Sequence, residues 1–278
     1  MESGLLPNWL PMLAVRQGSP AKAVVAGRRY VLADLSPELL EKLYASEIEY
    51  FYVPRSPKRV RLPRSVTTSL AYLVGYHLGD GYLEDIDKTI RRKGRPDYEI
   101  GYSDKSREML RLVLMPIFQR LFGVSLLVSK KKGENMYVAR LYSKIVYIFL
   151  QAVLGLPNGK KPSGGIPSHV QHDEKLLKYF LRGFFDAEGY AYFDTWNRKP
   201  RVGITNSNKA LLYEIKALLR KGFHIPMMGP YKKHRQDCWE LKLFEEGAIQ
   251  EFVTNIGSSH PEKKNKLESL YTPPEGAT

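Results

Sequence analysis

Two acidic residues stand at matching places in two similar segments of the chain. Residues 73–81 read LVGYHLGDG and residues 181–189 read LRGFFDAEG, so Asp80 and Glu188 each precede a glycine after an apolar run. Carboxylates are hard oxygen ligands that suit Mg²⁺ or a similar divalent ion better than zinc. Ions held in this way can activate water and stabilise the leaving oxygen in phosphodiester hydrolysis. The pair therefore predicts a metal-dependent hydrolytic site.

Small residues recur four positions apart ahead of each acid. The two pairs are Gly75 with Gly79 and Gly183 with Ala187. On a helix this spacing leaves one face where a partner backbone can approach closely. We expect two helices to pack through these faces and to bring Asp80 and Glu188 together at their C-terminal ends, where the partial negative charge of each helix requires a nearby cation. We expect Gly81 and Gly189 to adopt the left-handed conformation that often ends a helix.

The pattern of elements around each acid occurs twice. The first occurrence of the pattern predicts a helix at 68–79, strands at 82–93 and 96–103, a helix at 105–122, strands at 124–131 and 136–142, and a helix at 143–154. The second predicts a helix at 174–187, strands at 190–196 and 201–205, a helix at 208–221, strands at 228–234 and 238–244, and a helix at 246–256. Both halves read αββαββα. They predict an α+β fold of two pseudo-symmetric repeats, with helices on one face of each antiparallel sheet and the other faces forming a saddle.

Basic residues outnumber acidic ones by a wide margin. The chain has 43 Lys and Arg against 29 Asp and Glu, a net charge of +14, which favours nucleic acid as the partner. Basic side chains recur in both repeats on the expected strands and hairpin tips, and strand ribbons of this kind fit the DNA major groove. Exposure of hairpin tips explains any one cluster but explains their recurrence less well. The predicted DNA contacts are Arg91, Arg92, Lys93, Arg95, Lys130, Lys131, Lys132, Arg140, Arg198, Lys199, Arg201, Lys232, Lys233 and Arg235.

Composition divides the chain into four parts. They are an N-terminal extension at 1–66, a first repeat at 67–156, a linker at 157–172, and a second repeat with a C-terminal tail at 173–278. The extension is expected to be a small α/β segment, with a hairpin that turns at Gly27 and a helix that begins at Ser36. Its basic run at 55–64, RSPKRVRLPR, is either a solvated connector or a further polyanion contact.

Other features exclude several classes of protein. Cys238 is the only cysteine, so the chain can form no internal disulfide and no thiolate zinc cluster. The only apolar opening is interrupted by Pro7 and Pro11, which argues against a signal peptide or a membrane partner. We therefore expect a cytoplasmic protein associated with the nucleoid.

The motif segments resemble those of single-chain LAGLIDADG homing endonucleases of the archaeal type. The resemblance covers about residues 68–270, and it includes LAYLVGYHLGDGYL, YSDKSREML, ITNSNKALL and HPEKKNKLE. It implies a monomeric enzyme that cuts both strands of double-stranded DNA at a long asymmetric or pseudo-palindromic site, leaving short 3′ overhangs. A non-cleaving intron RNA maturase or a DNA-binding regulator on the same fold is the alternative, and intron RNA is then a candidate partner.

The same resemblance implies roles for individual residues. Asp80 and Glu188 would bind the metal ions, either Mg²⁺ or another divalent cation such as Mn²⁺. The backbone carbonyls of Gly79 and Ala187 would assist. Polar residues that organise water around the scissile phosphates would be Asp104, Lys105 and Asn206.

Two positions depart from the family pattern. Leu78 stands where the name motif has an acid, whereas the second motif keeps Asp186 there; this position is not the essential metal ligand. Ser207 stands at the counterpart of Lys105, so the second basic catalytic residue is not defined. Candidates for it are Lys232 and Lys233.

Overall fold

The computed structural model describes residues 22–25, 28–31, 48–54, 56–159, 165–171, 173–234 and 237–270. By their contacts, these residues form two compact units. Unit 1 is drawn from Met1–Thr67, Gly81–Lys105 and Leu110–Lys161, and unit 2 from Thr68–Asp80, Ser106–Met109 and Pro162–Thr278. The helix that carries the first motif thus belongs by its contacts to unit 2, together with the second repeat.

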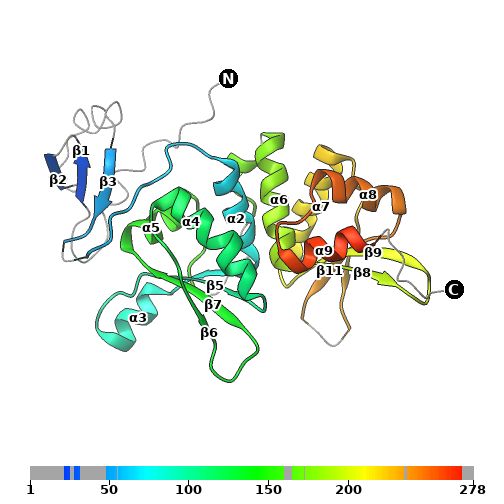
Figure 1. Cartoon of the computed structure of the whole chain (residues 1–278), viewed down its shortest axis with the longest axis horizontal. Helices are drawn as coiled ribbons and strands as arrows, with labels where there is room; N and C mark the ends of the chain where they lie inside the picture. Colours follow the sequence, from blue (N-terminus) through cyan, green and yellow to red (C-terminus); the bar gives the residue numbers. More distant parts are fainter. Residues whose placement is uncertain are drawn as a thin grey trace. The chain divides into compact units, whose positions relative to one another are not determined.

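Unit 1 contains a four-stranded antiparallel sheet of order β4-β5-β7-β6. Its strands are β4 (Gly81–Leu83), β5 (Glu99–Asp104), β6 (Leu127–Lys130) and β7 (Tyr137–Tyr142). Helices α4 (Met115–Phe122) and α5 (Lys144–Ile148) lie on one side of this sheet (Figure 1). The ring of Tyr102 on β5 meets Phe118 of α4 edge to face at 5.6 Å, so aromatic side chains join sheet and helix.

The long helix expected at 105–122 is present and continuous from 107 to 122, but its hydrogen-bond register changes within it. A π-helix, η3 (Met109–Leu114), precedes α4, and Ser106 accepts a hydrogen bond from the Met109 amide at the start of the helical region. Pro116 stands at the beginning of α4 and has no N–H to donate, which accounts for the change of hydrogen-bond register there. A second π-helix, η4 (Phe149–Val153), extends α5.

The strand expected at 82–93 is wrong beyond Leu83. Residues Ile86–Lys93 form helix α3, so Arg91, Arg92 and Lys93 lie on a helix rather than on a strand. The Asp85 carboxylate caps this helix by accepting from the Lys88 amide at 3.0 Å, and Gly94 ends it with φ 69°. These local signals favour a helix, and they outweigh the short alternation of apolar and polar residues.

The N-terminal strands form a separate three-stranded sheet in unit 1, of order β2-β1-β3. The predicted hairpin is confirmed as β1 (Lys22–Val25) and β2 (Arg28–Val31), whereas β3 (Ile48–Tyr52) was not predicted. The turn at Gly27 and the helix from Ser36 lie outside the described residues.

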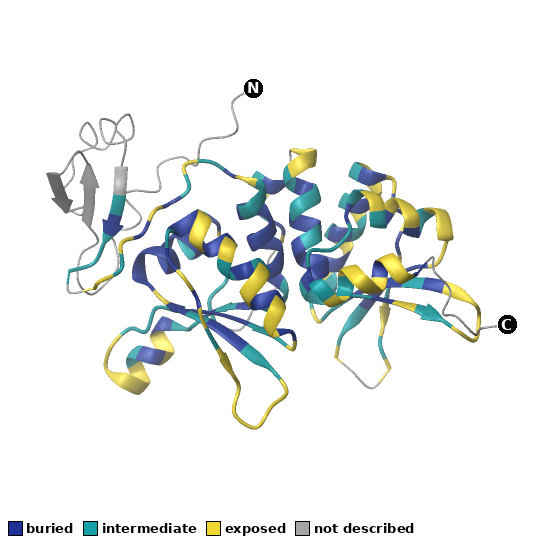
Figure 2. Ribbon diagram, viewed as in Figure 1, coloured by how far each residue is buried: buried dark blue, intermediate teal, exposed yellow. Residues whose placement is uncertain are grey.

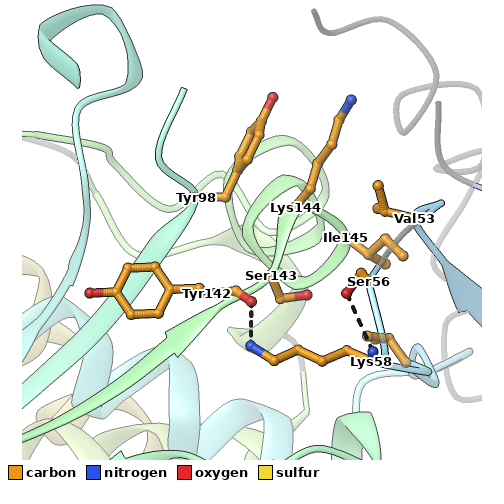
Figure 3. Close-up of a pocket in the computed structure, with 9 residues that line it drawn as sticks. Val53, Ser56, Lys58, Tyr98, Tyr142, Ser143, Lys144 and Ile145 are labelled. Atoms are coloured by element: carbon orange, nitrogen blue, oxygen red, sulfur yellow. Dashed lines mark hydrogen bonds between the residues drawn. The ribbon is translucent and has the colours of Figure 1, made fainter. Parts of the chain in front are cut away.

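The basic run after β3 packs against unit 1. Val60 is 1% exposed and bridges Phe51, and the Arg61 amide donates to the Phe122 carbonyl at the end of α4. The Lys58 ammonium donates to the Tyr142 carbonyl at 2.6 Å, and both residues line a cavity of about 210 Å³ (Figure 3). Part of the run is therefore packed on unit 1, while the side chains of Arg59, Arg61 and Arg64 are exposed.

Unit 2 contains the second four-stranded antiparallel sheet, of order β10-β11-β9-β8. Its strands are β8 (Gly189–Asp194), β9 (Lys199–Asn206), β10 (Met228–Lys232) and β11 (Trp239–Leu243). Its helices are α6 (Glu174–Glu188), α7 (Lys209–Phe223), α8 (Glu246–Asn255) and α9 (Pro261–Ser269), after a short 3₁₀ turn, η5 (Ser168–Val170). The predicted α+β class and the two antiparallel sheets are confirmed, but helix α9 was not predicted.

Helix α2 (Thr68–Asp80) packs along α6 within unit 2. Every residue from Leu70 to Leu78 is buried, which Figure 2 shows along most of the helix. A helix buried on all sides has no polar face, and this explains why His77 is the only charged or strongly polar residue between Leu70 and Leu78. None of the described helices is long and apolar enough to cross a membrane.

Candidate active site

The two motif helices touch backbone to backbone at their glycines. A β-carbon on Gly75 would stand 2.0 Å from the Phe180 carbonyl oxygen, and one on Gly183 would stand 2.1 Å from that of Tyr72. The contacts are reciprocal, because 183 − 75 and 180 − 72 both equal 108. This reciprocity is what a local two-fold axis between two repeats produces. The helix interface predicted from the small residues is therefore present.

The C-terminal ends of α2 and α6 also meet. A β-carbon on Gly79 would lie 2.3 Å from that of Ala187 and 2.9 Å from the Glu188 Cγ atom. The Glu188 side chain thus lies against the last turn of α2, one residue before Asp80. The structure brings both acids to the same end of the helix pair, as the motif spacing predicts.

Gly81 and Gly189 were expected in a left-handed conformation, and this expectation is wrong. Gly189 has φ −83° and ψ 159°, and Gly81 has no positive φ. Each residue instead begins a strand directly after its helix. Glycine is required at 189 by close approach, since a β-carbon there would lie 2.1 Å from the Phe185 ring.

Asn206 reaches Glu188 from the sheet. It is the last residue of β9, and its Nδ2 donates to the Glu188 Oε1 at 2.7 Å. The Asn206 Oδ1 in turn accepts from the Asn208 amide at 2.8 Å, which fixes the orientation of the side-chain amide. The Glu188 carboxylate is thereby held by a side chain that is itself held in place.

Asp104 and Lys105 lie at the matching end of the other sheet. Asp104 is the last residue of β5 and pairs with Tyr137 across the sheet, and Lys105 follows it, exposed. Ser207 follows β9 in the same way, as predicted from its place in the repeat.

Asp186 is fully buried and serves as a structural acceptor. It accepts from the Tyr72 hydroxyl at 2.6 Å, from the Ser259 amide at 2.9 Å and from the Ser258 hydroxyl. Burial raises the pKa of Asp186, and these hydrogen bonds and the charge of Lys263 oppose that rise. The carboxylate therefore ties α2 to α6 and to the segment before α9.

Lys263 is a residue of this region that the sequence did not single out. Its ammonium donates to the carbonyl oxygens of Asp186 at 2.6 Å, Ala187 at 2.9 Å and Phe185 at 3.3 Å. These carbonyls belong to the last turn of α6, where backbone acceptors have no partner within the helix. A lysine from α9 thus supplies positive charge at the helix end, where the two acids made a cation necessary.

The oxygen atoms at this end fit a hard divalent cation. Asp80 and Glu188 offer carboxylates, and the final carbonyls of both helices are oxygen donors of the same class. No group of three His, Cys, Asp or Glu residues that could hold a metal occurs in the part of the chain that the structure describes. A metal at this end would therefore use the two carboxylates, backbone carbonyls and water.

A tyrosine next to each motif packs over a glycine of the neighbouring strand. A β-carbon on Gly101 would lie 2.1 Å from the Tyr82 ring, and one on Gly203 would lie 2.3 Å from that of Tyr190. The Tyr82 hydroxyl donates to Glu99 at 2.6 Å, and the Tyr190 hydroxyl donates to Glu240 at 2.8 Å. Burial raises the pKa of each tyrosine, so both hydroxyls remain protonated donors.

A cation completes each of these networks. Arg140 donates to Glu99 at 3.0 Å, and Lys242 lies 2.8 Å from Glu240. The predicted contact residue Arg140 is thus already paired with a carboxylate. The same kind of tyrosine, glutamate and cation network therefore occurs in each of the two sheets.

The predicted DNA-contact residues differ in exposure and in whether an acidic side chain already pairs with them. Several are exposed: Arg91, Arg92, Lys93, Arg95, Lys130, Lys131, Lys132, Arg198, Lys199 and Lys232. Some of the set already have acidic partners, such as Lys93 with Asp97 at 2.6 Å and Lys131 with Glu134 at 2.8 Å. Arg201 lies 3.5 Å from Asp194 and is only 17% exposed. Lys233 is half-buried, and Arg235 lies outside the described residues.

Comparison with known proteins supports the resemblance that the motifs indicate. Residues 175–257, from α6 to just beyond α8, match the family model of the LAGLIDADG-like domain. Two proteins of Methanocaldococcus jannaschii are similar over most of this chain. The glutamine–fructose-6-phosphate aminotransferase is 25% identical over 78% of it, and the DNA helicase Hel308 is 28% identical over 72%. This chain spans 19% and 16% of the length of those two proteins.

The fold is also that of the homing endonuclease I-DmoI. Structures of its variants match with a TM-score of 0.51 and 22% identity, over 68% of this chain and 95% of theirs. The complex of I-DmoI with DNA and Mn matches with a TM-score of 0.50 and 24% identity, over 69% of this chain and 97% of that one. The chain therefore has the LAGLIDADG fold, with both repeats on one polypeptide.

Proposed function

We propose that the chain is a site-specific endonuclease that hydrolyses both strands of DNA with divalent metal ions. The observation that carries this proposal is the placement of Asp80 and Glu188 at the same end of a helix pair whose backbones are in contact. One acid from each repeat, related by a local two-fold axis, suits a duplex in which two strands of opposite direction must each be cut.

The protein groups have distinct parts in this reaction. Asp80, Glu188 and the carbonyls of Gly79 and Ala187 would hold Mg²⁺ or Mn²⁺, which when bound would supply an activated water and stabilise the leaving oxygen. Asn206 orients the Glu188 carboxylate through its hydrogen bond. Asp104 and Lys105 are proposed to order water near the phosphates. I-DmoI, which has the same fold, has been crystallised with DNA and Mn, with target DNA and Mg, and with DNA and Ca.

DNA would bind through the basic side chains of the two sheets. Lys130 and Lys132 in unit 1 and Arg198 and Lys199 in unit 2 are exposed near strand ends or hairpin tips. Lysine and arginine contacts with phosphates position a protein on the duplex, while contacts with base edges in the major groove select the sequence. We propose that one chain acts as a monomer, because it carries both motifs.

Cleavage of a plasmid library with random inserts, followed by sequencing of the ends, tests this function. The wild-type protein should cut a defined site in the presence of Mg²⁺, and Asp80→Asn or Glu188→Gln should abolish double-strand cleavage while leaving DNA binding largely intact. Asp87→Asn is the matched control, since it removes an exposed carboxylate of α3 and should cut normally.

Two results would contradict the proposal. Full activity in both acid variants would show that the pair is not the metal site. Retained DNA or RNA binding without cleavage by the wild-type protein would favour a regulator or an intron RNA maturase on the same fold.

A further inference from the structure

The segment between α8 and α9 follows one face of α6. Arg182 donates through Nε to the Ile256 carbonyl, and Asp186, one turn later, accepts from Ser258 and Ser259. Positions 182 and 186 are four apart, so they lie on the same helix face. The segment therefore runs along α6 toward its C-terminal end and reaches it at Lys263.

At that end, Lys263 bonds three consecutive carbonyls, including that of Ala187. Ala187 directly precedes Glu188, so the ammonium lies within one residue of the carboxylate along the backbone. Its charge is opposite in sign both to the helix terminus and to the carboxylates there. An ammonium group in this place offsets part of the negative charge that a divalent cation would otherwise neutralise.

The first motif lacks the carboxylate on which this arrangement depends. Leu78 stands at the position that matches Asp186, and it is buried and offers no side-chain acceptor. Asp186 of α6 connects Tyr72 of α2 with Ser258 and Ser259. Any displacement of the segment between α8 and α9 would therefore be transmitted to both motif helices. The arrangement is therefore a property of the second motif.

We propose that Lys263 is a positioning residue for Glu188, which offsets the negative charge at the end of α6 and assembles the carboxylate pair before a divalent ion binds. The inference rests on the proposed function, because it takes this end of the helix pair as the metal site. A divalent ion held by these residues would be repelled by the ammonium and would compete with it for the Ala187 carbonyl. Lys263 and the metal should therefore stabilise the same structure but weaken each other's effect.

Thermal melting of the full chain in EDTA and across a Mg²⁺ titration tests this coupling. Lys263→Met keeps the aliphatic stem and removes the charge, so it should melt lower than wild type in EDTA and recover most of the difference in Mg²⁺. Its half-maximal Mg²⁺ concentration should fall by on the order of tenfold, because a nearby positive charge has been removed. Lys263→Arg should restore wild-type behaviour.

Lys264→Met provides the matched control. Lys264 is the next residue of α9, is 59% exposed, and lies 4.0 Å from Glu268, so its loss should change neither the melting temperature nor the Mg²⁺ response. If Lys263→Met does not fold in either condition, Lys263→Gln keeps two N–H donors without the charge and is judged by the same criterion.

The outcomes separate the two ideas. If Mg²⁺ raises the melting temperature of wild type and of Lys263→Met equally, the positioning role is wrong and the proposed metal site stands. If Mg²⁺ raises neither and the wild type cuts no DNA, the proposed function fails, and the inference fails with it.

Discussion

The Phe180 carbonyl oxygen lies 2.0 Å from the point that a β-carbon on Gly75 would occupy. A non-bonded carbon and oxygen cannot approach so closely, and both groups belong to helix backbones, which cannot move aside as a flexible side chain would. The separation of the helices that carry the acids therefore depends on Gly75 and Gly183, because each has a hydrogen atom where any other residue has a β-carbon.

Gly75→Ala and Gly183→Ala should each destabilise the protein. One added methyl group forces α2 and α6 apart, and overpacking of this kind costs about 1–3 kcal/mol, or more where backbone must shift. Chemical denaturation of both variants measures the loss. Gly247→Ala is the control: it lies in α8 with nothing within 4 Å of the added carbon, so helix propensity alone should make it neutral or slightly stabilising. Wild-type stability in both motif variants would show that the helices do not touch there.

Asn206→Leu should lower the cleavage rate much more than DNA binding. The leucine fills similar space but cannot donate to Glu188, and loss of a group that orients a metal ligand typically reduces metal affinity or activity by about 10–100-fold. Single-turnover cleavage at several Mg²⁺ concentrations measures the effect. Asn197→Leu, at an exposed turn where the side chain bonds only Asp194, is the comparison and should keep the wild-type rate. Equal rates in the two variants would rule out a role for the Asn206 amide.

Tyr72→Phe and Asp186→Asn should show strong coupling in a double-mutant cycle. The buried hydroxyl and carboxylate are 2.6 Å apart, and a hydrogen bond to a charged group contributes about 1.5–3 kcal/mol. Each single variant should lower the free energy of unfolding, and the double variant should lose less than the sum of the two. Tyr213→Phe removes a hydroxyl from a tyrosine that is 52% exposed and should have little effect. Additive losses would mean that the pair does not interact.

DNA binding should be steeply dependent on salt. If each repeat contacts about four to six phosphates, log K should fall with log salt with a slope of roughly −7 to −11. Replacing Lys130 and Lys132 by alanine should make this slope shallower by about 1.8, at about 0.9 per phosphate. The same change at Lys264 and Lys266 on α9 should leave it unchanged. A wild-type slope shallower than about −3 would exclude both sheet faces as the binding surface.

The helix pair and the position of the acids could be predicted because their signals are local and occur twice. Small residues at 75 and 79 and at 183 and 187 are four apart, so each pair lies on one helix face, and the acids at 80 and 188 follow directly at the helix ends. Helix α3 was missed although its signals were present: Asp85 at its start and Gly94 at its end are ordinary helix caps. The alternation around Ile86 and Ile90 is too short to specify a strand against these caps.

The role of Lys263 could not be predicted from the sequence. It is one of several lysines in EKKNK, and its partners lie 76 to 78 positions earlier in the chain. Nothing in local spacing distinguishes it from Lys264, which is exposed on the same helix. The acceptor role of Asp186 was missed for the same reason, since its partners Tyr72 and Ser258 come from distant segments.

Helix α2 belongs to the first repeat in sequence but packs in unit 2, so dividing the chain between the repeats separates α2 from α6. A cut after Lys161 would leave α2 on one fragment and α6 on the other, each exposing to water a backbone surface that only the other fragment covers. The two fragments should therefore bind each other specifically through the complementary backbone surfaces of α2 and α6. Each would carry one acid, so restored cleavage would report their reassembly.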